Sequence, residues 1–191
     1  MSLTKIPYTM TDTSLADAIN AAAASAAATA KSEAIAAASV KLPGDVVQVV
    51  NTQTGAVATT TTVMPFDDTI PQITEGGEFM TRTITPTSAA NMLRIDVVFN
   101  GSPNAASYVT AALFKNSDAN ALAVGTHYAG NGEYAQTVFT FFMQAGTTSL
   151  TTFRVRAGQH VGGTLTMNGD GGARRLAGIL FSSITITEIK A

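Results

Sequence analysis

Two different periodicities divide the chain near residues 42–44. Residues 14–41 contain 14 alanines and neither glycine nor proline, and alanine has the highest helix propensity of all residues. From Asp45 onward, short runs of β-branched and aromatic residues alternate with polar ones, as at residues 93–99. Turn residues interrupt these runs at intervals of roughly 8–12 positions. The change of period predicts one long helix followed by a β-structured domain.

The predicted helix is poor in large apolar side chains. Ser14 and Asp17 have the spacing of a capping box at its start. Leu15 and Ile19 begin a 4-3-4 apolar spacing, but Ile35 falls out of phase, so the sequence does not establish a continuous heptad. Because small alanine side chains let helices approach closely, we expect Leu15, Ile19 and Ile35 to form an oligomer interface in a bundle of several copies. A loose Ala/Ser linker is the alternative.

The remaining 147 or so residues show no helical period and read as about nine strands. Glycine, proline and asparagine separate them, as at residues 100–103 and 168–172, which we expect to be turns. The pattern predicts a mainly β protein, an antiparallel β-sandwich of jelly-roll or TNF-like type preceded by the Ala-rich helix. The expected strands lie at residues 46–50, 78–84, 93–99, 109–113, 121–128, 134–143, 150–156, 161–167 and 176–189.

One of these runs, residues 138–143, has large apolar side chains at both alternating sets of positions. Successive side chains of a strand point to opposite faces. Phe139, Phe141 and Phe142 therefore cannot all face one core, and a two-layer sandwich would leave one set in water. We expect these three residues to lie at an oligomer interface.

The composition is unusual for a protein that contacts water. Charged residues make up 13% of the chain, about half of the roughly 25% of typical soluble domains, while 32 alanines and 29 threonines make up nearly a third. A net charge of −2 gives no basic patch for nucleic acid. Cysteine is absent, so disulfides and thiolate metal sites are excluded.

The N-terminal sequence predicts neither export nor membrane insertion. It lacks a basic segment followed by an apolar one, so we expect synthesis in a cytoplasm without a secretory signal. Residues 19–38 carry several polar side chains and almost no large apolar ones, which disfavours a membrane span.

Candidate catalytic groups are sparse. His127 and His160 lack the spacing of a metal site or of a Ser–His–Asp triad. Asp67 and Asp68 lie between prolines, where turn formation is the favoured reading over the paired carboxylates of a glycoside hydrolase. The segment 168–174 has too few ligand oxygens for calcium. We expect no enzymatic activity, cofactor or metal.

Three tyrosines lie beside polar loops, a composition that suits sugar recognition. Tyr108, Tyr128 and Tyr134 flank loops rich in glycine, asparagine and serine, including Asn131. Aromatic rings stack on pyranose rings, and amides can bind sugar hydroxyls. We hypothesise that these four residues bind a receptor, with ordinary strand-end packing as the equally good alternative.

Several segments spread along the β domain resemble small β-structured modules of tailed-bacteriophage fibre and appendage proteins. They include a Thr-Pro-Thr-Ser stretch before an alternating strand and a Gly-rich turn before the last strand. The resemblance covers about three quarters of the chain and is carried by residues 43–50, 83–89, 93–97, 111–114 and 168–190.

The resemblance implies a homotrimeric virion component that helps to recognise a host surface. Residues 1–12 would be a virion-attachment segment that binds other virion proteins, residues 13–42 a helical stalk and residues 43–191 a knob. We therefore expect a short fibre or spike whose knob binds a host-surface receptor, with a glycan as the expected partner. A capsid decoration protein that stabilises the phage head is the alternative, and a polysaccharide-cleaving enzyme is a third class without positive support.

Overall fold

The computed structural model describes residues 12–191, and for residues 12–13 and 35–39 it describes the backbone alone. The expected virion-attachment segment, apart from its last residue, therefore lies outside the described residues, as does the side chain of Ile35. The chain divides into two compact units, residues 1–41 and 42–191.

The helix of the first unit, α1, spans Asp12–Ser39. Its start places Ser14 inside the first turn, so the expected capping position at Ser14 is wrong; the helix begins two residues before Ser14, a shift common at helix ends. Leu15 and Ile19 are both exposed, and the helix bundle stays a prediction. Among the described residues, no helix is long and apolar enough to cross a membrane.

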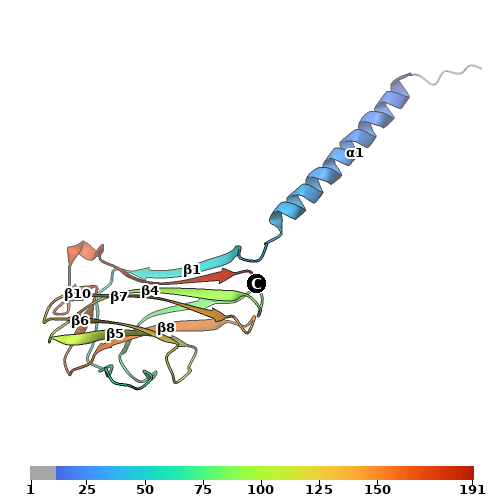
Figure 1. Cartoon of the computed structure of the whole chain (residues 1–191). Coiled ribbons are helices and arrows are strands. Elements are labelled where there is room, and N and C mark those ends of the chain that lie inside the picture. The colour runs from blue at the N-terminus through green and yellow to red at the C-terminus, as the bar shows by residue number, and fades with distance from the viewer. Residues whose placement is uncertain (1–11) are drawn as a thin grey trace, which may run out of the picture. The chain divides into compact units, whose positions relative to one another are not determined.

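The second unit is a two-layer antiparallel sandwich (Figure 1). Its eight long strands form two sheets, with the orders β1-β12-β4-β7 and β3-β8-β5-β6. This is the arrangement of a jelly roll. This confirms the expected fold class. The long strands are β1 (Val46–Thr54), β3 (Gly77–Ile84), β4 (Met92–Pro103), β5 (Ser107–Lys115), β6 (Ala123–Ala129), β7 (Ala135–Gln144), β8 (Thr151–Gln159) and β12 (Ser182–Ile189).

Short elements complete the unit. Two of them extend the β1-β12-β4-β7 sheet beside the end of β4, and two form a small hairpin. They are β2 (Ala58–Thr60), β9 (Leu165–Met167), β10 (Gly169–Asp170), β11 (Ala173–Arg174) and the 3₁₀ helix η1 (Leu176–Gly178).

Alternation along the strands produces the core. In β4, Leu93, Ile95, Val97 and Phe99 are fully buried between the sheets, as their spacing predicts. Buried side chains of β5, β8 and β12 complete this core. They include Leu113, Phe153, Val155, Ile184 and Ile186.

The structure corrects three expected elements. One is the strand at residues 161–167, of which only Leu165–Met167 is a strand. The predicted turn at residues 100–103 is wrong, because these residues continue β4. A Cβ on Gly101 would lie 2.7 Å from the Phe99 ring, so this glycine makes room for core packing rather than for a turn. The expected strand at residues 176–189 begins only at Ser182, since Leu176 and Ala177 have left-handed backbone angles. The predicted turn at residues 168–172 is confirmed by the β10–β11 hairpin.

The two faces of β7 have different environments. Phe139 and Phe141 are half-buried and pack against the core, whereas Val138 and Phe142 point the other way and are exposed. Phe139 and Phe141 therefore lie on the inner face of their own sandwich, and Phe142 is the member of the predicted interface set that faces outward. The exposed apolar surface deduced from the sequence is present on this chain.

A buried carboxylate joins three segments near the start of β1. Glu188 is fully buried and accepts hydrogen bonds from Gln48 Nε2 at 2.6 Å, Asn91 Nδ2 at 2.6 Å, and the backbone N–H and hydroxyl of Thr87 at 2.8 Å each. Burial acts to raise the pKa of Glu188, but these hydrogen bonds outweigh it and hold the pKa below its ordinary value. The Thr-Pro-Thr-Ser stretch thus wraps a buried negative charge.

Glu188→Gln should lower the free energy of unfolding by about 2–3 kcal/mol at neutral pH. The hydrogen bonds to a charged carboxylate are lost, and one of the groups that donate to Glu188 would face an amide N–H₂ instead of an acceptor. Urea denaturation measures the change. The exposed Asp118→Asn is the control and should change stability by less than about 0.5 kcal/mol.

The same substitution should alter the pH dependence of stability. A carboxyl whose folded pKa is lowered stabilises the protein above its unfolded pKa, and this contribution is lost as pH falls through the folded pKa. The stability difference between wild type and Glu188→Gln should therefore shrink as pH falls below about 4.5. A difference that stays constant down to acid pH would contradict the assignment.

Candidate binding site at one end of the sandwich

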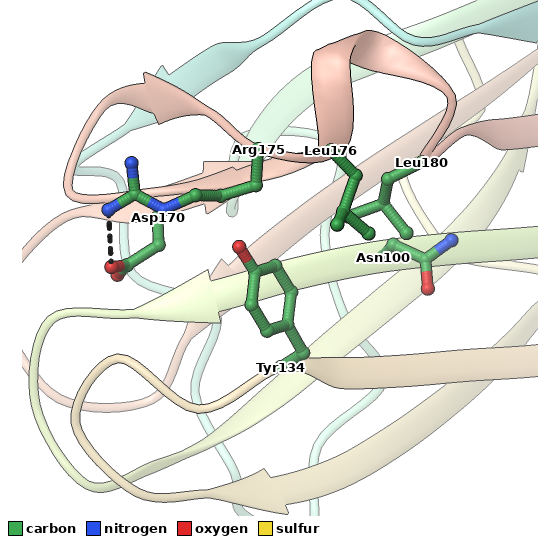
Figure 2. A pocket seen from close by; sticks show the side chains of 6 residues that line it. All are labelled: Asn100, Tyr134, Asp170, Arg175, Leu176 and Leu180. Atoms are coloured by element: carbon green, nitrogen blue, oxygen red, sulfur yellow. Dashed lines mark hydrogen bonds and ion pairs between the residues drawn. The ribbon is translucent and has the colours of Figure 1, made fainter.

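A pocket of about 340 Å³ opens at one end of the sandwich, within the roughly 300–1,000 Å³ range of small-ligand sites. The β1-β12-β4-β7 sheet supplies one wall, and the β10–β11 hairpin with the following loop supplies the other (Figure 2). The lining residues are Asn100, Tyr134, Asp170, Arg175, Leu176 and Leu180.

A hydrogen-bond network fixes the floor of this pocket. Asn100 is nearly buried, and its Nδ2 donates to the carbonyl of Phe181 at 2.6 Å. The Ser182 hydroxyl accepts from the backbone N–H of Asn100 and donates to the side-chain oxygen of Asn168, whose Nδ2 donates to the carbonyl of Thr54. Three strands and the hairpin are thereby tied together, so the pocket is formed in advance of any ligand.

The polar rim consists of an opposite-charge pair. Arg175 Nη2 lies 3.2 Å from Asp170 Oδ2 (Figure 2), and the Ser102 hydroxyl donates to Asp170 Oδ1 at 3.1 Å. A carboxylate has about four acceptor positions and a guanidinium five donors, so both groups keep unused hydrogen-bonding capacity toward the pocket. The rim can accept and donate at once.

The apolar wall is built from Leu176, Leu180 and the Tyr134 ring, and the two leucines lie beside each other across from the tyrosine (Figure 2). Leu176 and Ala177 have φ angles of 48° and 53°, values that non-glycine residues adopt at a cost. This left-handed pair presents the largely exposed Leu176 side chain to the pocket instead of continuing β11 into β12.

The pocket lies at the opposite end of the sandwich from the start of β1. Val46 pairs with Ile189, whereas Thr54, at the other end of β1, pairs with Ser182 beside the pocket floor. Eight residues of strand separate these ends, which corresponds to roughly 26 Å. In Figure 1 the β10 hairpin is accordingly at the far end from the point where the chain enters β1.

The four residues predicted to bind a receptor are not brought together. Tyr134 lines the pocket, and Asn131 is exposed in the adjoining turn without lining it. Tyr108 and Tyr128 lie on the outer face of the β3-β8-β5-β6 sheet, since the next residue of β6, Ala129, is buried in the core. The sequence hypothesis therefore combined two separate surfaces.

The second surface is an aromatic cluster. Phe66 stacks on Tyr108 with ring centroids 3.9 Å apart, and Tyr128 contacts Tyr108 edge-on at 5.1 Å. Because Phe66 covers one face of Tyr108, that ring takes part in packing.

Sequence reasoning missed five of the six pocket residues. The sequence predicts turns at residues 100–103 and 168–172, which contain Asn100 and Asp170, and it indicates no role for Arg175. Leu176 and Leu180 were assigned to a strand. The one available signal was the sequence Leu-Ala-Gly-Ile-Leu after two arginines, because it breaks strand alternation and contains a glycine with φ of 85° at position 178.

His160 has a structural environment. Its Nδ1 accepts the backbone N–H of Tyr108 at 3.0 Å and lies 2.8 Å from the hydroxyl of the buried Ser107. The serine hydroxyl in turn accepts from the His160 N–H. The buried Ser107 and the half-buried His160 are thus held by hydrogen bonds to each other and to the backbone, and His127 is exposed elsewhere on β6.

The remaining candidate chemistry is accounted for by local structure. Asp67 Oδ1 accepts from the hydroxyl and N–H of Thr69, and these bonds lower the pKa of Asp67, as expected for a turn. Among the described residues, no three histidine or acidic side chains gather as metal ligands. Asp170 is the one carboxylate that lines the pocket, so the lining offers binding groups rather than a carboxylate pair.

Comparisons with known proteins find no matching family, and no curated protein matches the sequence. Among solved structures, the chain is similar to the Eiger TNF of S. frugiperda, with 10% identity and a TM-score of 0.41 over 75% of this chain and 94% of the other. It is also similar to the C-terminal domain of EclA, a sugar-binding protein, with 14% identity and a TM-score of 0.33 over 59% and 73%.

A third similar structure is the enzymatically active domain of bacteriophage CBA120 tailspike protein 4, with 13% identity and a TM-score of 0.27 over 63% of this chain and 18% of the other. All three similarities are at low identity and concern the β-sandwich alone.

His160→Ala should lower the free energy of unfolding by about 1–3 kcal/mol, because it leaves the Tyr108 N–H without its acceptor and removes the contact of Nδ1 with the Ser107 hydroxyl. His127→Ala is the matched control, with an expected change within about 0.5 kcal/mol. Chemical denaturation compares the two variants. Equal stabilities would contradict a structural role for His160.

Proposed function

We propose that this protein is a structural component of a phage virion, a short trimeric fibre or spike whose sandwich binds a glycan on the host surface. The pocket at the end of the sandwich opposite to the start of β1 is the observation that carries the proposal. In an appendage that is anchored through its N-terminal segment, that end is available to face the host.

The residue types of the pocket suit a sugar. The Tyr134 ring is 44% exposed and can stack on a pyranose face. Asp170 and Arg175 can accept and donate hydrogen bonds with neighbouring hydroxyls. A single site of this kind binds weakly, but several copies on one appendage and several appendages on one particle give firm attachment.

The outer face of the β1-β12-β4-β7 sheet supports assembly of several copies. Val49, Thr187, Arg94 and Phe142 lie in one row across the four strands, and both apolar members of the row are exposed. Arg94 is paired with Asp96 at 3.0 Å, so the face carries no net charge. A face of this kind can be covered by another copy without isolating a charge.

Tyr134→Ala should weaken binding to an array of purified bacterial surface polysaccharides by at least about tenfold, because the stacking surface is removed. Tyr128→Ala is the matched control, since Tyr128 is 56% exposed on the opposite sheet. Biolayer interferometry measures both variants. Equal losses would contradict the pocket, and absence of binding by the wild-type oligomer to every polysaccharide would contradict the glycan-binding role.

Val138→Asp should shift the full-length protein from trimer toward monomer, because it places an unpaired charge in the apolar face between copies. Val124→Asp is the control: Val124 is 46% exposed on the other sheet and Val138 is 60% exposed. Multi-angle light scattering gives the mass. A wild-type monomer of about 20 kDa at micromolar concentration would contradict the trimer.

A further inference from the structure

The charges of the pocket limit its ligand to neutral compounds. Asp170 and Arg175 form an ion pair at the rim, and the other four lining residues are uncharged. An acidic sugar would gain from Arg175 but would lie beside the Asp170 carboxylate, and an amino sugar would meet the reverse situation. A neutral ligand can hydrogen-bond to both groups without separating them.

The apolar wall is larger than a fully hydroxylated sugar requires. Tyr134 can cover one face of a pyranose ring, which leaves Leu176 and Leu180 as a second apolar surface across the pocket. Hydroxyl groups placed against two leucines would lose hydrogen bonds to water without replacement. A methyl group placed there is instead removed from water favourably.

The position of the polar groups completes the constraint. Each end of the Asn100 amide already binds a protein group, since Nδ2 donates to the carbonyl of Phe181 and Oδ1 accepts from Gln136 Nε2. The other polar groups of the lining are the Tyr134 hydroxyl and the Asp170–Arg175 pair, which lies on the side of the pocket away from the two leucines (Figure 2). The pocket has one polar side and one apolar side.

We infer that the pocket selects a neutral hexopyranose that carries a methyl group, either a 6-deoxy sugar or an N-acetylated sugar. The ring stacks on Tyr134, the methyl group contacts Leu176 and Leu180, and the ring hydroxyls bind Asp170 and Arg175. This inference rests on the proposed glycan-binding function and names the class of sugar that the site takes.

Matched monosaccharides test the inference on the full-length protein by saturation-transfer NMR and competitive titration. Rhamnose is compared with mannose, and fucose with galactose, each of the same configuration and with a hydroxyl at C6. N-acetylglucosamine is compared with glucose. At least one methyl-bearing sugar should bind about fourfold tighter than its partner, the effect of one buried methyl group, and its methyl protons should receive the strongest saturation. The two sets of pairs separate the 6-deoxy source from the acetamido source.

Leu176→Ser should remove this preference, because the affinity for the methyl-bearing sugar should fall toward that for its hydroxylated partner. Leu176 is 68% exposed, and Leu150→Ser changes a leucine of similar exposure, 65%, in a loop outside the pocket. Thermal melting shows whether both variants are folded. Leu180→Ser provides a second readout from the same wall.

The outcomes separate this inference from the proposed function. Polysaccharide binding that depends on Tyr134 but shows no preference for methyl-bearing sugars would overturn the inference alone. Tighter binding of glucuronic acid than of every neutral sugar would overturn it as well. Absence of binding to polysaccharides and monosaccharides alike would overturn the proposed function together with it.

Discussion

The pairing of β4 along both of its edges is the constraint on which the sandwich depends. β12 pairs with one edge and β7 with the other, and β9 continues the first edge where β12 ends. Because the strand is twelve residues long, its alternation sets the core along the whole sheet. It also holds Asn91, a partner of the buried Glu188, just before one end and Asn100, the pocket floor, near the other.

The sequence predicted the fold because most strands obey alternation locally. The eight long strands follow apolar periodicity closely enough to indicate a jelly roll, and the low charge with the two-faced run at residues 138–143 correctly indicated an exposed apolar surface. The interior position of Phe139 and Phe141 follows from strand register, which decides the face that each residue of an alternating run occupies. A single sequence contains no direct record of register.

The binding pocket could not be predicted because it depends on contacts between distant segments. Asn100-Gly101-Ser102-Pro103 has the composition of a turn, yet Gly101 is needed so that Phe99 can pack and the strand continues. Asp170 has the composition expected of a hairpin turn, and it does lie in the β10–β11 hairpin. It also forms an ion pair with Arg175, which its local sequence does not indicate. Local composition indicates the turn propensity of these residues, whereas their contacts in the pocket and the core depend on tertiary packing. Tyr134 was found because an aromatic residue beside a turn is informative without knowledge of its neighbours.

The position of β1 gives the sandwich a direction for mechanical load. The chain enters β1 at Val46, and the pocket lies roughly 26 Å away at the other end of the same sheet. If the pocket holds a ligand while the N-terminal side is pulled, the force runs along β1, parallel to the strand. The hydrogen bonds between β1 and β12 are then strained together in shear instead of opening one after another. An antiparallel pair loaded in this way resists separation until many bonds fail at once, a property that would suit the proposed role in attachment.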